Sequence, residues 1–361
     1  MMASDKLSFV DVMNAFAIEF DVDPYGDGHI NDTYIADSTP KYILQRINTS
    51  IFKNPDELMH NISAVTTHLR NKIIENGGNP DRETLNIIKT TDDKLYYKSK
   101  EGKCYRMYKF IDNTLSLNLP ENPEQFEESA RAFGQFQNML ADFDASTLNE
   151  TIPDFHHTPK RTQNLINAYE KDAAGRKNEV KDIYDGYMKY AEICNSIQDC
   201  LDSGEIPYRV THNDTKLNNV LFDKETEKCL CVIDLDTVMP GSLLCDFGDS
   251  LRFGASTAVE DEADLDKVWF SLEYFESYTK GFIGELKDTI TKKEIELLPL
   301  SALILTYECG IRFLTDYLDG DTYFKIHYPD QNLVRAKNHL KLCQDIFSKL
   351  DDMKKIVEKY I

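Results

Sequence analysis

The spacing of hydrophobic residues divides the chain into two parts. Between residues 25 and 111 most hydrophobic runs are short and strand-like, as in YILQRI (42–47) and CYRMYKFI (104–111). A two-residue alternation is typical of strands with one buried face. The exception is the stretch 55–76, in which hydrophobic residues recur at the helical spacings of four, three and four: Leu58, Ile62, Val65 and Leu69. This part of the chain is predicted to be a small β-rich lobe with one long helix.

After about residue 122 the spacing becomes helical. A stripe of large hydrophobic residues runs from Phe126 to Phe143, and Pro123 stands where proline commonly starts a helix. Further helices are predicted at roughly 160–175, at 177–202, and over most of the chain from about 259 to the end. This part is therefore predicted to be mainly helical.

Two strand-like runs, 219–223 and 228–236, interrupt the helical part and are joined by a polar turn. They predict a β-hairpin. The change from strands to helices falls in the short polar stretch IDNT, residues 111–114. We expect an α+β protein with two lobes, 1–112 and 113–361, because a chain of 361 residues exceeds the size at which one core stops growing.

The charge of the chain excludes one class of partner. The formal net charge is −21, whereas nucleic-acid binding rests on Lys and Arg that neutralise phosphates. The N-terminal hydrophobic stretch is interrupted by Asp11 and Glu19, which is unlike a signal peptide, and no hydrophobic run has the length of a membrane span. We expect a cytoplasmic protein that binds neither nucleic acid nor membrane, and nothing in the sequence implies a protein partner.

Cysteines and histidines show no metal-binding spacing. The eight cysteines are dispersed, and the close pair Cys229 and Cys231 has no second pair at metal-ligand spacing. His156 and His157 stand in a polar loop without a suitably spaced partner. We expect reduced thiols and two solvent-exposed histidines.

The stretch VTHNDTKLNNVLFD, residues 210–223, crowds hydrogen-bonding residues between hydrophobic ends. Phosphoryl transfer needs a carboxylate that orients or deprotonates the attacking hydroxyl, oxygen ligands for Mg²⁺, and positive charge along the phosphates. Asp214 is followed by Asn219 and, after the predicted hairpin, by Asp234. Protein kinases use the same order of catalytic Asp, metal-binding Asn and later metal-binding Asp. The pattern predicts kinase chemistry.

The same residues carry a family resemblance. The segments HNDTKLNNVLFD and VIDLDTVMPGSLLCDFGD resemble the catalytic segment of the aminoglycoside phosphotransferase and choline kinase superfamily. Longer segments between about residues 20 and 345, among them YGDGHINDTYI, YILQRINTSIF and ECGIRFL, are similar to the N-acetylhexosamine 1-kinases. The resemblance implies a bilobal protein-kinase-like fold with a nucleotide-binding N-terminal lobe and a catalytic, sugar-binding C-terminal lobe. It also implies ATP as phosphoryl donor, Mg²⁺ as cofactor, and the anomeric hydroxyl of N-acetylglucosamine or N-acetylgalactosamine as acceptor.

The resemblance assigns roles to three residues of the catalytic segment. It makes Asp214 the general base on the sugar hydroxyl, and it makes Asn219 and Asp234 the Mg²⁺ ligands. Lys216 is a candidate cation for the γ-phosphate, because protein kinases often place a lysine two residues after the catalytic Asp.

Two further carboxylates follow in the same segment. Asp246 belongs to a DFG sequence but lies 32 residues after Asp214 (246 − 214), whereas Asp234 lies 20 residues after it (234 − 214) and ends a hydrophobic strand. We therefore expect Asp246 to brace the catalytic turn by hydrogen bonds. Asp236 is at most a second oxygen ligand.

The nucleotide side has one departure from the superfamily pattern. Gly26 and Gly28 would let a turn approach the phosphates, with Asn31 three residues later, although a plain hairpin turn is the alternative. The third strand of this superfamily usually carries Lys or Arg toward the phosphates, but the matching position is Gln45. Its neighbour Arg46 points to the opposite face by alternation. Lys216 is a candidate substitute.

The acceptor site is the least specific prediction. A charge such as Arg312 in a hydrophobic helix is costly unless it is paired or binds a ligand. The alternative for Arg312 is an ion pair with Glu308, one turn earlier. His29 and Phe253 suit the hydroxyl rim and apolar face of a sugar, or are ordinary loop and core residues. The predicted acceptor-site residues are His29, Asn213, Asp214, Phe253 and Arg312.

Three hypotheses follow. The first is an ATP- and Mg²⁺-dependent N-acetylhexosamine 1-kinase. The second is the same chemistry on another small alcohol, such as homoserine, choline or an aminoglycoside. The third is a nucleotide-binding pseudokinase, which the missing third-strand cation suggests and the intact Asp214, Asn219 and Asp234 disfavour.

Overall fold

The computed structural model describes residues 3–18, 22–26, 30–286 and 288–361. The backbone divides into two compact units. Unit 1 comprises residues 1–115, 146–153 and 221–239, and unit 2 comprises 116–145, 154–220 and 240–361. The proposed lobes 1–112 and 113–361 stay a prediction, since compactness does not show what either unit binds. Gly28 and His29 lie outside the described residues.

Unit 1 contains an antiparallel sheet that includes the strands predicted from alternation. Its order is β1-β2-β3-β6-β4, and β5 also pairs with β6. Gln45 on β3 lies directly opposite Arg106 on β6. The strands described in this sheet are β1 (Val22–Pro24), β2 (Asp32–Ala36), β3 (Tyr42–Ile47), β4 (Ile87–Ile88), β5 (Tyr97–Lys98) and β6 (Cys104–Lys109).

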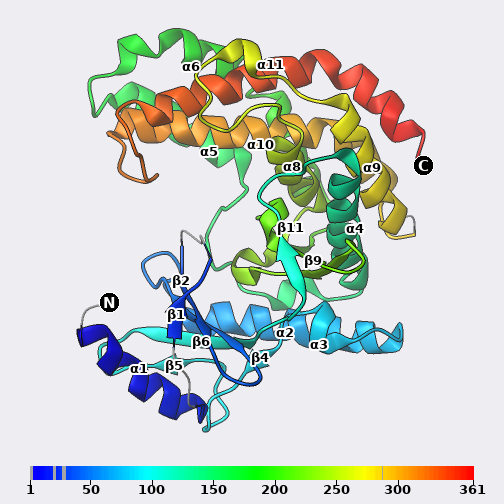
Figure 1. Cartoon of the computed structure of the whole chain (residues 1–361). Helices are drawn as coiled ribbons and strands as arrows, with labels where there is room; N and C mark the ends of the chain where they lie inside the picture. The colour runs from blue at the N-terminus through cyan, green and yellow to red at the C-terminus, as the bar shows by residue number, and fades with distance from the viewer. Residues whose placement is uncertain (1–2, 19–21, 27–29, 287) are drawn as a thin grey trace. The chain divides into compact units, whose positions relative to one another are not determined.

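Helices cover this sheet. Helix α1 (Ala3–Phe16) contributes Phe9, Val12 and Phe16 to a core shared with the strands. Helix α2 (Pro55–Glu75) begins at a proline in its first turn and buries the predicted stripe. A single turn, α3 (Pro80–Glu83), follows it. The prediction of one long helix among strands is confirmed for α2, and Figure 1 shows it in light blue beside the strands of unit 1.

The predicted hairpin is present. Strands β9 (Val220–Asp223) and β10 (Cys229–Val232) pair, and β7 (Thr114–Ser116) extends them into a three-stranded sheet. A 3₁₀ turn, η5 (Leu235–Thr237), follows β10 directly after Asp234. Asp234 adopts the left-handed backbone conformation, with φ of 60°. This conformation ends the strand and turns the chain sharply.

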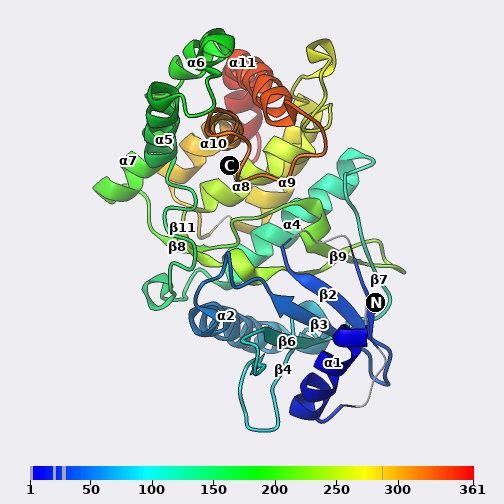
Figure 2. The ribbon, with the colours of Figure 1, turned by 90° about the vertical axis from the view of Figure 1, so that its left-hand side faces the viewer.

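Unit 2 is mainly helical. Helix α10 packs on α8, α11 and α5, and α4 packs on α9 (Figures 1 and 2). Its described helices are α4 (Pro123–Met139), α5 (Thr158–Lys171), α6 (Lys181–Met188), α7 (Ser196–Ser203), α8 (Leu243–Gly254), α9 (Leu272–Leu286), α10 (Lys292–Asp319) and α11 (Gln331–Glu358). Strands β8 (Arg209–Thr211) and β11 (Met239–Gly241) form a short ribbon. The remaining 3₁₀ turns are η1 (Ala145–Thr147), η2 (Lys177–Glu179), η3 (Ile193–Asn195), η4 (Leu217–Asn219) and η6 (Leu265–Lys267).

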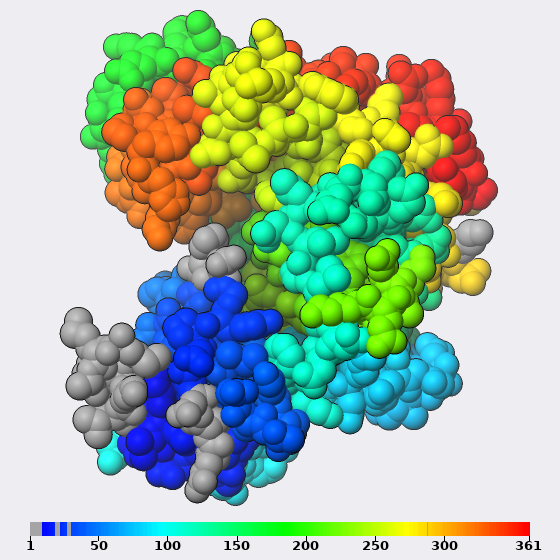
Figure 3. Space-filling view, viewed as in Figure 1, coloured from blue at the N-terminus to red at the C-terminus, as the bar shows by residue number. Residues whose placement is uncertain are grey.

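Helix α10 is the central helix of unit 2. It is long and apolar enough to cross a membrane by length and composition alone, but most of its apolar stretch is buried inside the protein. A capping box of Thr291 and Glu294 fixes its start. The segment that follows it, shown in orange in Figure 3, lies at the surface of unit 2. The burial of the apolar stretch of α10 is typical of a core helix.

Candidate active site

Helix α8 supports the catalytic turn through one buried carboxylate. Asp246 accepts hydrogen bonds from the backbone N–H of His212 (2.9 Å) and of Asn213 (2.7 Å). The side chain of Gln137 donates a third, at 2.6 Å. Burial raises the pKa of Asp246, although His212 and these donors act in the opposite direction. The prediction that Asp246 braces the turn is confirmed.

The glycine after Asp246 has a packing role. A Cβ atom on Gly248 would lie 2.4 Å from the backbone oxygen of Ser301 on α10. Only glycine allows α8 and α10 to approach this closely without a shift. The DFG letters therefore reflect a brace and a helix contact within unit 2.

A second carboxylate of α8 holds the next residue of the turn. Asp249 accepts a hydrogen bond from the backbone N–H of Thr215 at 3.1 Å. Arg252 donates twice to the other oxygen of Asp249, at 2.8 and 3.1 Å. Asp249 is buried, which opposes its ionisation, but the charges of Arg252, Lys216 and His156 together lower its pKa below the usual value. Two buried carboxylates thus fix the backbone of three residues of the turn, His212, Asn213 and Thr215, on both sides of Asp214.

Asp214 lies between a lysine and an amide. The Nζ atom of Lys216 is 3.0 Å from Oδ1 of Asp214, and Nδ2 of Asn219 is 3.2 Å from Oδ2. The Asp214 side chain is 24% exposed and that of Lys216 is 39% exposed, so both can meet a ligand. The Asp214 charge raises the pKa of Lys216. The structure therefore brings together Asn213, Asp214, Lys216 and Asn219, all in unit 2.

Asn219 is oriented as an oxygen ligand. Its Nδ2 atom donates to the backbone oxygen of Asp214 at 2.8 Å as well as to the carboxylate. With the nitrogen committed to Asp214, the Oδ1 atom is left to accept from elsewhere. A carbonyl-type oxygen beside a carboxylate suits Mg²⁺. Asn219 therefore has the donor chemistry expected of one Mg²⁺ ligand.

A buried histidine contacts the same turn. The Nδ1 atom of His156 lies 2.7 Å from Glu308 on α10, and Nε2 lies 3.2 Å from the backbone oxygen of Asn213. The side chain of His156 is only 11% exposed, so the prediction that it is solvent exposed is wrong. Burial lowers the pKa of His156, but Glu308, Asp249 and the Asn213 backbone together raise it by more, so the net shift of the pKa is upward. A carboxylate 152 positions away in the sequence supplies the compensation.

Arg312 has aromatic neighbours in place of a carboxylate. Its guanidinium carbon lies 5.9 Å from the ring centre of Phe155, 6.0 Å from Tyr323 and 5.5 Å from Phe324. Among the described residues no ion pair or hydrogen bond involves its side chain. Glu308, the alternative partner, is bound by His156 and by Thr158 at 2.8 Å. The ion pair considered for Arg312 is therefore not formed.

A second arginine lies close to Arg312. The Nη2 atom of Arg161 donates to the backbone oxygen of Phe155 at 3.1 Å, and its buried Nε has no hydrogen-bond partner in the described chain. Burial lowers the pKa of Arg161, and the Arg312 charge lowers it further. Two guanidinium groups with unused donors are thus held near one another beside Phe155.

Phe253, another predicted acceptor-site residue, lies beside a small cavity. It is half-buried on α8 and lines a cavity of about 60 Å³ with Arg252, Glu260 and His339. This volume is well below the ~300 Å³ at which small-molecule pockets begin. The role of Phe253 against a sugar stays a prediction.

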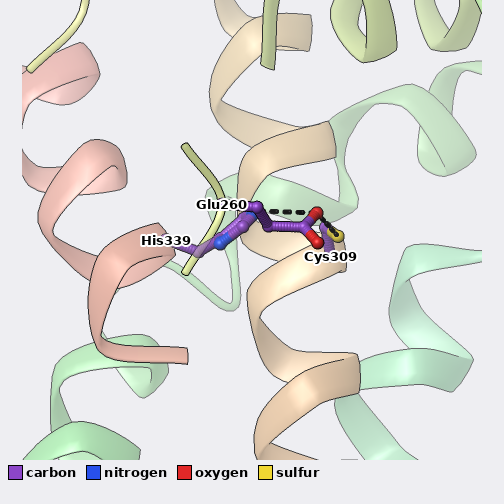
Figure 4. Close-up of side chains that lie close together, drawn as sticks. All are labelled: Glu260, Cys309 and His339. Carbon is purple, nitrogen blue, oxygen red and sulfur yellow. Dashed lines mark hydrogen bonds and ion pairs between the residues drawn. The ribbon is translucent and has the colours of Figure 1, made fainter. Parts of the chain in front are cut away.

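The same cavity borders a possible metal-binding group. Glu260, Cys309 and His339 have potential ligand atoms within 4.8 Å of one another (Figure 4). However, Arg252 donates to Glu260 at 3.2 Å, and Nε of Arg335 lies 3.7 Å from the same carboxylate. Burial raises the pKa of Cys309 to about 11, which disfavours the thiolate that binds metals. The two guanidinium groups already compensate Glu260, so this group does not fit a divalent cation.

In unit 1 the structure describes Gly26 and Asn31 of the predicted phosphate-binding turn. Gly26 has φ of 73°, a conformation that favours glycine. The Nδ2 atom of Asn31 donates to Oδ2 of Asp236 at 2.6 Å, and Oδ1 accepts from the backbone N–H of Asn48 at 2.9 Å. Asn31 therefore ties the chain after the glycine turn to the segment after Asp234.

Gln45 is held by a cation on the next strand. Its Oε1 accepts from Nε and Nη2 of Arg106 at 3.0 and 2.8 Å, and its Nε2 donates to Thr33 at 3.1 Å. Nη1 of Arg106 is in ion contact with Oδ1 of Asp236 at 2.5 Å. The strand next to the predicted one thus supplies a buried arginine.

Sequence reasoning missed His156, Arg161 and Arg106. Arg106 had the clearest signal, since it stands in the hydrophobic run CYRMYKFI, where a charge is costly without a partner. The same argument singled out Arg312 in its helix. His156 and Arg161 lie in a polar segment, TIPDFHHTPKRTQ, that gives no sign of burial.

Comparisons with known proteins show the family and the fold of the chain. Residues 21–272, more than half of the chain, match the model of the phosphotransferase enzyme family (APH). An aminoglycoside phosphotransferase from Alicyclobacillus acidocaldarius is 14% identical, with a TM-score of 0.62, over 93% of this chain and 92% of that one. A choline kinase from Cryptosporidium parvum is 13% identical, with a TM-score of 0.59, over 99% of both chains.

A third solved structure of this kind contains ligands. A spectinomycin phosphotransferase in complex with ADP and spectinomycin is 16% identical, with a TM-score of 0.54, over 95% of this chain and 99% of that one. At these identities the likeness shows the fold, and it confirms the expected kinase-like α+β fold with a small sheet-containing region and a larger helical region. The family match goes further: this chain belongs to the phosphotransferase enzyme family of small-molecule kinases.

Proposed function

We propose that the protein is an ATP- and Mg²⁺-dependent kinase that phosphorylates the anomeric hydroxyl of N-acetylhexosamines to give the sugar 1-phosphate. The observation that carries the proposal is the catalytic turn, in which Asp214 is partly exposed between Lys216 and Asn219. The resemblance of the long segments in the sequence supports the acceptor class. We also propose a cytoplasmic location.

Asp214 would orient the acceptor hydroxyl and accept its proton. A carboxylate fixed by its neighbours holds the hydroxyl in line with the γ-phosphate, and such positioning supplies much of the rate in phosphoryl transfer. Asn219 and Asp234 would hold Mg²⁺, which would offset the negative charge of the phosphates. Lys216 is protonated beside Asp214, and its positive charge would offset the negative charge of the transferred phosphoryl group.

The donor would bind through unit 1. Gly26, Gly28 and Asn31 would form the turn over the phosphates, with Gln45 on the sheet beneath it. The spectinomycin phosphotransferase of the same fold was solved with ADP, which supports a nucleotide donor. A nucleotide is therefore the donor proposed for this chain too.

The acceptor side favours a neutral, hydroxyl-rich molecule. Arg161 and Arg312 offer hydrogen-bond donors with positive charge, and a cationic acceptor such as choline would be repelled there. Tyr323, whose ring lies beside Arg312, is 72% exposed, and an aromatic face suits the apolar face of a sugar. Arg312, Asn213 and Asp214, with His29 and Phe253, are the proposed acceptor residues.

Homoserine, choline and aminoglycosides remain the alternatives within the family. The solved relatives include enzymes named for an aminoglycoside and for choline. A cationic acceptor calls for carboxylates or an aromatic cage without competing cations. The two arginines are the observation that favours the sugar over these acceptors.

The test is ³¹P NMR of the protein with Mg-ATP and single acceptors. The panel contains N-acetylglucosamine, N-acetylgalactosamine, glucose, galactose, homoserine, choline and kanamycin. A new phosphorus signal coupled to the anomeric proton of an N-acetylhexosamine is expected. Transfer to choline, homoserine or kanamycin alone would keep the Asp214 mechanism and overturn the sugar assignment. Transfer to none of the panel would overturn it as well.

A further inference from the structure

Arg106 is a buried charge at the centre of unit 1. It is 1% exposed and is one of the largest fully buried side chains of the protein. It lies on β6 directly opposite Gln45, the position at which the superfamily usually has its third-strand cation. The cation is therefore present, but it comes from the neighbouring strand.

The contacts of Arg106 link two predicted parts of the nucleotide site. Its guanidinium binds Gln45 with two nitrogens and Asp236 with the third. Asp236 uses its other oxygen to accept from Asn31. Asn31 follows the glycine turn, and Asp236 lies two residues after Asp234. One cation thus joins the phosphate turn, the sheet and the metal-binding segment.

Protein kinases join these parts differently. They pair a lysine of the third strand with a glutamate of the following helix. The buried face of α2, which the structure describes in full, carries no carboxylate. It presents Asn61, whose Nδ2 donates to the backbone oxygen of Val238 at 3.0 Å. The helix therefore binds the segment after Asp234 by a neutral amide, and the ion pair has moved to Arg106 and Asp236.

We propose that Arg106 is the positioning residue that replaces the third-strand cation: by fixing Asp236 it sets the positions of Asp234 and of the glycine turn around the Mg-nucleotide. This inference rests on the proposed nucleotide role of those two elements. Because Arg106 is fully buried, it acts through Asp236 and Asn31 and does not contact phosphate. Burial opposes its charge, but Asp236 raises the pKa of Arg106 above its ordinary value.

The test measures binding of Mg-ADP in the absence of acceptor, so an incorrect acceptor assignment does not affect it. We expect Arg106→Gln to raise the Mg²⁺ concentration needed for half-maximal ADP binding by about 10- to 100-fold, as for other residues that orient metal ligands. The matched control is Arg46→Gln, which removes the same charge from an exposed ion pair with Asp32 on the same sheet.

Moving the cation separates position from mere stability. In Gln45→Lys/Arg106→Gln the charge returns to the third strand, opposite its present place, and about tenfold of the lost Mg²⁺ affinity should return. If Arg106→Gln does not fold, Arg106→Gln/Asp236→Asn removes both charges and should fold with the same weak Mg²⁺ dependence. The proposal is overturned if Arg106→Gln, or Arg106→Gln/Asp236→Asn where the single variant does not fold, binds Mg-ADP within threefold of the parent protein at every Mg²⁺ concentration.

Discussion

Each unit of the protein contains a buried carboxylate that fixes a backbone segment, but the two carboxylates are compensated in different ways. In unit 2, Asp246 binds two backbone N–H groups and the neutral amide of Gln137. In unit 1, Asp236 binds the cation Arg106 and the amide of Asn31. Neutral donors from the backbone fix a turn whatever its side chains are. A cation instead fixes the segment that carries its partner carboxylate. Removal of either member of the ion pair leaves the other member as a buried charge without a partner.

The largest expected effect is on Asp214, which lies between the residues that Asp246 and Asp249 hold. Asp214→Asn should lower kcat by roughly 10²–10⁴, because the amide cannot accept the hydroxyl proton. The unfolding free energy should change little, since the side chain is partly exposed and its backbone supports are untouched. Steady-state kinetics with a thermal unfolding control measures both. A kcat within tenfold of the parent value would remove Asp214 from the role of base.

The next effect separates the two kinds of compensation. Asp236→Leu should lower the unfolding free energy by about 3–5 kcal/mol, because Arg106 is then a buried charge without its partner. Adding Arg106→Met should return most of that loss, since well-packed hydrophobic residues often replace buried ion pairs without cost. Urea unfolding of the parent, the two single variants and the double variant gives the coupling energy between Asp236 and Arg106. Additive losses would show that the pair does not act as one unit.

Asp246 should behave differently under the same test. Asp246→Asn keeps one acceptor oxygen for the backbone N–H groups but places an NH₂ group among donors, with an expected cost of about 1–3 kcal/mol. Because two of its three donors are backbone groups, a second side-chain substitution cannot remove them. Combination with Gln137→Leu should therefore not restore stability in urea unfolding. Recovery by more than half would contradict the contrast drawn between the two carboxylates.

The contrast also explains what the sequence could predict. The order of Asp214, Asn219 and Asp234 and the bracing role of Asp246 follow from spacing along one segment. The partner of Asp236 does not, because Arg106 lies 130 residues earlier (236 − 106) and depends on strand register. His156 and Glu308 are a similar long-range pair. Spacing predicts residues that work within one turn, and it misses the partner that another element brings.

Helix boundaries show the same limit. The sequence predicts helix over residues 177–202, but the structure divides this stretch into η2, α6, η3 and α7. The buried residues Ile183, Tyr187, Cys194 and Leu201 keep a helical spacing across the break. The spacing of hydrophobic residues predicts which residues are buried. Here that spacing continues through positions at which the backbone leaves the α-helical conformation.

The smallest expected effect concerns pH and the pair His156 and Glu308. Because the folded-state pKa of His156 is raised above 6.5, protonation of His156 stabilises the fold below that pH, and this contribution is lost as the pH rises through the folded value. Glu308 has a lowered pKa, so its contribution is present above pH 4.5 and is lost as the pH falls through its folded value. The stability difference between the parent and His156→Gln should therefore be largest between these limits, near pH 5 to 6, and should shrink toward pH 8. Urea unfolding of both proteins across this range measures it. A difference that grows with pH would mean that the neutral imidazole, bound to the backbone of Asn213, is the form that the turn requires.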